Sequence, residues 1–150
     1  MNINTGAGII CYFDNKEGII KSLEKDIIYL ILVDTNNKYD FPKGAIDAGE
    51  SEFHCAIRET YEESNIETSD FEFLDKNSFI ENNGLRMFIG KLRKDLVENY
   101  KDIIKIKANP KFPSIKEHKA FMFLSKEKAS KNMLSYLDYF LEEIDDFINL

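Results

Sequence analysis

The segment from Ser51 to Asn65 constrains this chain most, because it predicts a helix with two chemically different sides. Ser51 can cap the first turn, and the helix should end near Asn65. At about 100° per residue, the residues of one side recur at steps of three and four and should pack inward; they are Phe53, Ala56, Ile57, Thr60, Tyr61 and Ser64. The other side carries four glutamates, Glu52, Glu59, Glu62 and Glu63.

Four carboxylates on one side of a helix require an explanation. Like charges at these spacings repel and destabilise a helix by roughly a few tenths of a kcal/mol per pair. One interpretation is an acidic face that water solvates. The other is a site for a hard divalent cation such as Mg2+ or Mn2+, which prefers carboxylate oxygens. The helix alone leaves both open.

The rest of the chain predicts a mixed α/β fold. Gly6–Phe13 and Ile27–Val33 should be neighbouring core strands, and a loop should run from Asp34 to Gly44. A hairpin should turn at 82–84, between strands 78–81 and 85–92, and a further strand should span 120–124. From about Lys126 the tail should be helical, covering the sheet or forming a dimer contact. This order predicts an α/β sandwich with a mixed sheet.

Length and composition predict one soluble domain over residues 1–150, since 43% of the residues are hydrophobic. The formal charge of −7 argues against a general nucleic-acid coat. Cys11 and Cys55 lack metal or disulfide spacing, so we expect free thiols in a reducing compartment. Neither a signal peptide nor an apolar run of about 18 residues is present. We therefore expect a cytoplasmic protein without a membrane segment.

The spacing of residues 44–66 decides between the two interpretations of the helix. Gly44, five residues, Glu50, seven residues and then Arg58-Glu59-Thr60-Tyr61-Glu62-Glu63 resembles the Nudix box, a pattern of 23 positions. Asn65 replaces the glycine of that pattern, and Asn is the residue other than Gly that best tolerates positive φ. Thr60 replaces an aliphatic residue. The resemblance implies a Nudix-type α/β/α sandwich and a metal-dependent hydrolase.

The same resemblance implies roles for the residues of the box. Glu59, Glu62, Glu63 and the carbonyl of Gly44 would bind Mg2+ or Mn2+, and Arg58 would orient the carboxylates. Glu50 is expected to support the loop. The metal ions would neutralise phosphate charge and lower the pKa of the attacking water. The general base could be Glu59, Glu63 or Glu117, a glutamate outside the box.

Three further segments look like those of diadenosine tetraphosphate (Ap4A) hydrolases within this family: Phe41-Pro42-Lys43-Gly44, Arg58-Glu59-Thr60, and Glu117-His118 before a strand. This likeness implies that Lys43 and Arg86 contact phosphate and that Glu117 reaches the metal, whereas His118 is expected to be structural. Tyr39 and Phe121 are candidates for stacking on a base, although both are also typical core residues.

The leading hypothesis is hydrolysis of a dinucleoside polyphosphate, a small molecule, by a monomer or homodimer. Removal of the mRNA cap and cleavage of diphosphoinositol polyphosphate are the alternatives within the family. RNA is a possible partner because the stretch 101–119 has six lysines against Asp102 and Glu117; these are Lys101, Lys105, Lys107, Lys111, Lys116 and Lys119. A nucleotide-binding module without turnover is the non-enzyme alternative, and the intact glutamates argue against it.

Overall fold

The computed structural model describes residues 3–21, 23, 25–99, 104–105 and 118–148, and of residues 104, 105 and 119 only the backbone. Its strands are β1 (Gly6–Asp14), β2 (Ile27–Asp34), β3 (Tyr39–Asp40), β4 (Lys43–Ala45), β5 (Phe71–Asn82), β6 (Leu85–Leu92), β7 (Ile104–Lys105) and β8 (His118–Ser125). Its helices are α1 (Glu52–Ser64), η1 (Thr68–Asp70), α2 (Lys94–Glu98), α3 (Lys126–Ser130), η2 (Ser135–Leu137), α4 (Asp138–Glu143) and α5 (Asp145–Ile148).

The strands form one mixed sheet, in the order β5-β6-β1-β2-β8-β7. β1 and β6 are parallel, and the other pairs in the described part of the sheet are antiparallel. The prediction that the first two long apolar segments are neighbouring strands is confirmed, since Tyr12 pairs with Tyr29.

Beyond that pair β1 and β2 separate, and residues 39–45 occupy the space between them. β3 pairs with β2, and β4 pairs with β1. The backbone N–H of Ile9 donates to the carbonyl of Pro42 at 3.1 Å, and a Cβ at Gly8 would overlap the same oxygen. The prediction of an uninterrupted loop from Asp34 to Gly44 is therefore wrong, because its second half completes the sheet.

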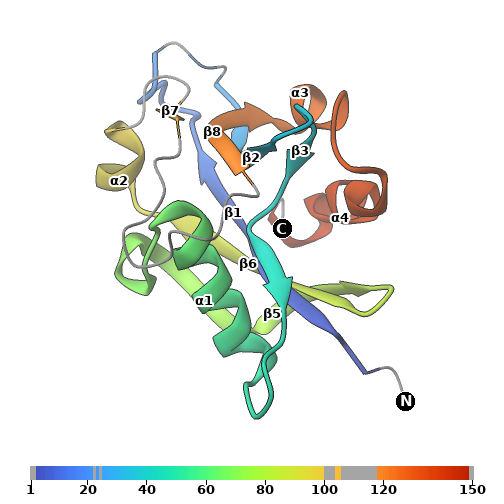
Figure 1. Cartoon of the computed structure of the whole chain (residues 1–150). Coiled ribbons are helices and arrows are strands. Elements are labelled where there is room, and N and C mark those ends of the chain that lie inside the picture. Colours follow the sequence, from blue (N-terminus) through green and yellow to red (C-terminus); the bar gives the residue numbers. More distant parts are fainter. Residues whose placement is uncertain (1–2, 22, 24, 100–103, 106–117, 149–150) are drawn as a thin grey trace.

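Helices cover both faces of the sheet (Figure 1). Alternate residues of β1 point to opposite faces, so Ile9 belongs to a core cluster with α1, and Ile10 belongs to a second cluster with α4. Buried Cys55 and Ala56 bring α1 onto the first face, and buried Phe140 brings α4 onto the second. The predicted α/β/α sandwich with a mixed sheet is confirmed.

The hairpin is confirmed at its turn, where Asn83 and Gly84 have φ of 49° and 81°, the conformation that a two-residue turn of this kind needs. Its first strand is longer than predicted, beginning at Phe71. The last long strand likewise begins two residues earlier than expected, at His118. Both cysteines are buried free thiols, as predicted.

The prediction of a continuous helical tail is wrong, because residues 131–134 leave the helix and run beside β3. The N–H of Tyr39 donates to the carbonyl of Asn132 at 2.9 Å, and the N–H of Leu134 donates to that of Tyr39 at 3.0 Å. Short helices follow and still cover the second face, although Phe147 is 41% exposed. In the ranges that the structure describes, no helix has the length and apolar character needed to cross a membrane.

Candidate active site

Both ends of α1 are fixed by the residues that the sequence indicated. The hydroxyl of Ser51 accepts a hydrogen bond from the N–H of His54 at 3.1 Å. Asn65 closes the helix in the left-handed region, with φ 62° and ψ 9°, and its N–H donates to the carbonyl of Tyr61. Asn65, at the position where the Nudix pattern has glycine, therefore adopts the left-handed conformation that a glycine cap commonly has.

The predicted inward side of α1 is confirmed at Ala56, Thr60 and Ser64, which are buried, but the buried side also includes a residue of the acidic side. Glu63 is 4% exposed, whereas Phe53 and Ile57 are only partly buried. The reason is that α1 packs against β4 as well as against β1 and β6, so part of its acidic side is covered.

Glu63 is thus a buried carboxylate close to the backbone of β4. Its Oε2 accepts a hydrogen bond from the N–H of Lys43 at 3.2 Å. Burial, reinforced by the negative charges of Asp40 and Glu59, raises the pKa of Glu63 to about 9. A site that holds these carboxylates so close together favours a bound cation, which would lower that pKa.

Arg58 links the other acidic side chains of the site. Its Nε and Nη2 donate to both oxygens of Glu50, at 2.8 and 3.0 Å. Its Nη1 lies 3.0 Å from Oε1 of Glu59 and 3.2 Å from Oε2 of Glu62. The hydrogen bonds from Arg58 lower the pKa of Glu50 to about 2. Glu50 also accepts from the N–H of Asp47 at 3.1 Å, so it supports the loop before α1.

Gly44 lies directly against the carboxylate of Glu59, and a Cβ at this position would overlap it. The absence of a side chain therefore lets the backbone of β4 and the carboxylate meet. Carbonyl and carboxylate oxygens are the donors that Mg2+ and Mn2+ prefer. Among the described residues, no three His, Cys, Asp or Glu side chains already form a group that could hold a metal ion. A metal site would thus need the Gly44 carbonyl or rearrangement of the glutamates around Arg58.

The backbone of Lys43, the residue before Gly44, contacts Glu63, and its side-chain ammonium contacts two other groups. Its Nζ lies 3.3 Å from Oδ1 of Asp40 and 5.1 Å from the centre of the Tyr136 ring. Burial disfavours the charge of Lys43, but Asp40 and the Tyr136 hydroxyl outweigh it, so the pKa of Lys43 is raised. Lys43 therefore remains a cation.

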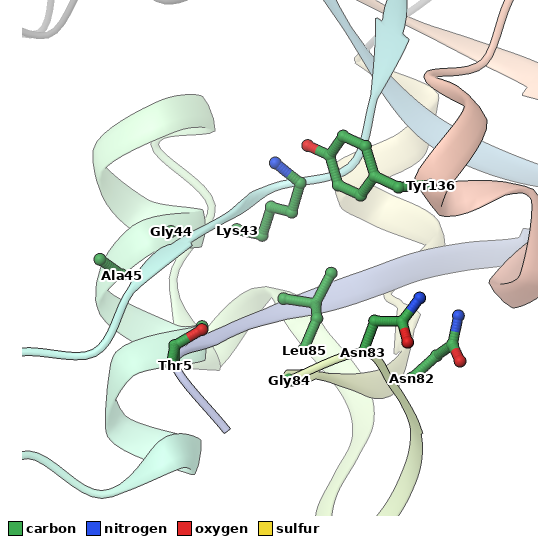
Figure 2. Close-up of a pocket in the computed structure, with 10 residues that line it drawn as sticks. Thr5, Lys43, Gly44, Ala45, Asn82, Asn83, Gly84, Leu85 and Tyr136 are labelled. Carbon is green, nitrogen blue, oxygen red and sulfur yellow. The ribbon is translucent and has the colours of Figure 1, made fainter. Parts of the chain in front are cut away.

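A cavity of about 510 Å³ opens beside Lys43 (Figure 2). Lys43 and Tyr136 lie together at one side of it, and the hairpin turn forms another wall. Its lining residues are Thr5, Gly6, Lys43, Gly44, Ala45, Asn82, Asn83, Gly84, Leu85 and Tyr136. Tyr136 was not predicted as a site residue from the sequence, where it lies within a tail assigned to one continuous helix.

The other predicted substrate contacts do not line this cavity. Arg86 lines a different one; its Nε lies 2.8 Å from Glu52, it pairs with Glu81, and its guanidinium stacks 4.0 Å from the Phe79 ring centre. Phe121 is 5% exposed within the first core cluster.

Tyr39 is half-buried against the second core cluster. Glu117 and four of the lysines, at positions 101, 107, 111 and 116, lie outside the described residues. For the remaining two, at 105 and 119, the structure describes the backbone alone.

Comparisons with known proteins agree with this architecture. The NUDIX domain model matches residues 6–132. A crystal structure of a C. elegans Ap4A hydrolase binary complex is similar with a TM-score of 0.68 and 22% identity, over 96% of this chain and 98% of that one. The E. coli dihydroneopterin triphosphate pyrophosphohydrolase is similar with a TM-score of 0.61 and 17% identity, over 99% of both chains.

No protein with a curated description matches the sequence. The domain match, however, includes the whole 44–66 motif, and the structure places that motif on α1 and the loop before it. The chain therefore belongs to the Nudix family of hydrolases.

Proposed function

We propose that this Nudix hydrolase cleaves a phosphoanhydride of a dinucleoside polyphosphate such as Ap4A, with Mg2+ or Mn2+ as cofactor. One observation carries the proposal: Lys43 and Gly44 line the cavity and also contact the acidic helix, Lys43 through Glu63 and Gly44 through Glu59. A nucleoside bound in the cavity would extend its phosphates past these two residues toward the carboxylates.

The cavity suits a nucleoside. Its volume of about 510 Å³ lies within the usual range for small-molecule sites. Tyr136 is 50% exposed, and its aromatic ring offers a surface for stacking on a base. Asn82 and Asn83 line the cavity, and their amide groups offer donors and acceptors to a base edge.

The phosphate end would lie between Lys43 and the glutamates. In this proposal the Lys43 ammonium binds a phosphate oxygen, and the Gly44 carbonyl, Glu59, Glu62 and Glu63 hold the metal ions. Divalent ions supply charge neutralisation and activation of water. Arg58 fixes Glu59 and Glu62 so that their oxygens are oriented before substrate binds. Glu59, Glu63 and Glu117 remain the three candidates for the general base.

Similarity in fold to the C. elegans Ap4A hydrolase supports this choice of substrate. The alternative of cap removal depends on the lysines of 101–119, whose side chains lie outside the described residues. Cleavage of diphosphoinositol polyphosphate has no specific support from the cavity, because Lys43 is the one cationic side chain among the described residues that line it.

The test is a substrate panel with purified protein and Mg2+ or Mn2+. Ap4A should be hydrolysed to ATP and AMP faster than capped RNA or a diphosphoinositol phosphate is cleaved. Glu63→Gln should lose this activity, and Glu142→Gln, which changes an exposed glutamate of α4, should retain it. Equal activity of Glu63→Gln would refute the metal-helix role. Salt-sensitive cleavage of capped RNA would favour cap removal, and nucleotide binding without turnover would favour a binding module.

A further inference from the structure

We infer that Asp40 is a positioning residue that aims the ammonium of Lys43 at substrate phosphate. The inference rests on the proposed role of Lys43. Its starting point is a buried carboxylate that the proposed chemistry does not use: the side chain of Asp40 is 8% exposed. A charge buried to this extent is costly unless it is paired and hydrogen-bonded.

Both oxygens of Asp40 have partners. Oδ1 lies 3.3 Å from Nζ of Lys43 and accepts a hydrogen bond from the N–H of Phe41 at 2.8 Å. Oδ2 lies 2.8 Å from Nε2 of His118, whose side chain is 4% exposed. Asp40 therefore connects Lys43 to a second buried side chain rather than to solvent.

The backbone fixes this arrangement from three segments. Asp40 ends β3, Lys43 begins β4 and His118 begins β8. Leu32 and Val33 of β2 pair with both β3 and β8, so these two strands lie on opposite edges of β2. The contact between Asp40 and His118 thus spans β2, and the sheet holds the carboxylate in place.

A fixed carboxylate beside Lys43 has a physical consequence for binding. A lysine side chain loses rotamer entropy when it is immobilised. Asp40 immobilises it before substrate arrives, so less entropy remains to be lost on binding. The ammonium has three donors, which leaves capacity for a phosphate oxygen beyond the contacts with Asp40 and Tyr136.

A double-mutant cycle tests whether Asp40 acts through Lys43. We would measure KM and kcat for Ap4A with Mg2+ in Asp40→Asn, Lys43→Met and the double variant. Asp40→Asn should raise KM about ten-fold and change kcat less. In the Lys43→Met background the same change should alter KM by less than about two-fold. An equal effect in both backgrounds would overturn the inference, since Asp40 would then act independently of Lys43.

A second variant guards against misfolding of Asp40→Asn. His118→Asn keeps the carboxylate but changes one partner, and it should raise KM less and lose that effect in the Lys43→Met background. Additive behaviour of His118→Asn would also count against the inference. Thermal unfolding checks that each variant is folded.

Matched controls come from an exposed ion pair away from the cavity, between Lys126 and Asp145 at 2.8 Å. Lys126→Met and Asp145→Asn should leave KM unchanged. If Lys43→Met itself leaves KM unchanged, the proposed phosphate contact is wrong and the inference falls with it. If Lys43→Met raises KM but does not couple to Asp40, the inference alone is refuted.

Discussion

The guanidinium of Arg58 binds both carboxylate oxygens of Glu50, through Nε at 2.8 Å and Nη2 at 3.0 Å. This planar pair joins the middle of α1 to the loop that precedes it. The remaining nitrogen, Nη1, contacts Glu59 and Glu62. Arg58 therefore holds both the loop before α1 and the proposed metal ligands Glu59 and Glu62.

Arg58→Lys should disable the site although it keeps the charge. A lysine cannot donate in the bidentate manner of a guanidinium, so Glu50, Glu59 and Glu62 would lose their common partner. We expect kcat/KM to fall at least about ten-fold and the free energy of unfolding to fall by about 1–2 kcal/mol. Enzyme assays and urea unfolding measure both. Arg93→Lys, at an exposed pair with Asp95, should change neither.

Gly44→Ala should remove activity with little loss of stability. The new Cβ would overlap the carboxylate of Glu59, and the flexible end of that side chain can move away. Gly49→Ala is the matched control in the same loop: its Cβ would meet no atom within 4 Å, but its φ of 77° should cost about 1 kcal/mol of stability. Retained activity in Gly44→Ala would show that the position of Glu59 is not required.

The metal-free protein should lose stability as pH rises, because of Glu63. Its pKa in the folded protein is raised to about 9, above the value of about 4.5 expected for the unfolded chain. The folded state therefore binds the extra proton, and the stabilisation present below about pH 4.5 is lost progressively up to about pH 9. The slope is at most about 1.4 kcal/mol per pH unit.

Urea unfolding in EDTA at several pH values measures this slope. Glu63→Gln should flatten the dependence and be more stable than the wild type near pH 8. Added Mg2+ should stabilise the wild type and leave the variant unchanged. An identical pH dependence in both proteins would contradict the assignment to Glu63.

Asn65 should respond to substitution as a left-handed cap. Asn65→Gly should leave stability unchanged or raise it, whereas Asn65→Ala should lower the free energy of unfolding by about 1 kcal/mol, because its φ is 62°. Urea unfolding distinguishes the two. Similar stability of both variants would mean that the cap conformation relaxes without cost.

Arg86→Met should act on stability rather than on substrate binding. The guanidinium pairs with Glu52 and Glu81, and it stacks on Phe79 in a cavity separate from Lys43. We expect a loss of about 1 kcal/mol with KM for Ap4A unchanged. A rise in KM without a loss of stability would restore the phosphate role that the sequence suggested.

Local signals explain what could be predicted from the sequence. The apolar runs of β1 and β2, the Asn-Asn-Gly turn and the caps at Ser51 and Asn65 depend on neighbours in the chain, and each was found. The box spacing likewise identified the helix that carries the acidic residues.

The features that were missed depend on tertiary contacts. β3 and β4 form because β1 and β2 separate, which no pattern within residues 39–45 reveals. Glu63 is buried because β4 covers it, whereas a helical wheel assigns it to solvent. Tyr136 reaches the cavity because residues 131–134 run beside Tyr39, and an apolar stripe alone cannot show that interruption.

Residues 39–45, which lie between β1 and β2, separate the acidic residues of α1 from the cavity, and the two parts of the site meet only over a short stretch of chain. The acidic residues belong to α1, and the cavity proposed to bind a nucleoside lies between the hairpin turn and the tail around Tyr136. That stretch is Lys43 and Gly44, which line the cavity and also contact the glutamates of α1. If the proposed function holds, substitution of Asn82, Asn83 or Tyr136 should therefore change which nucleoside end of the substrate is bound and leave the acidic residues of α1 in place.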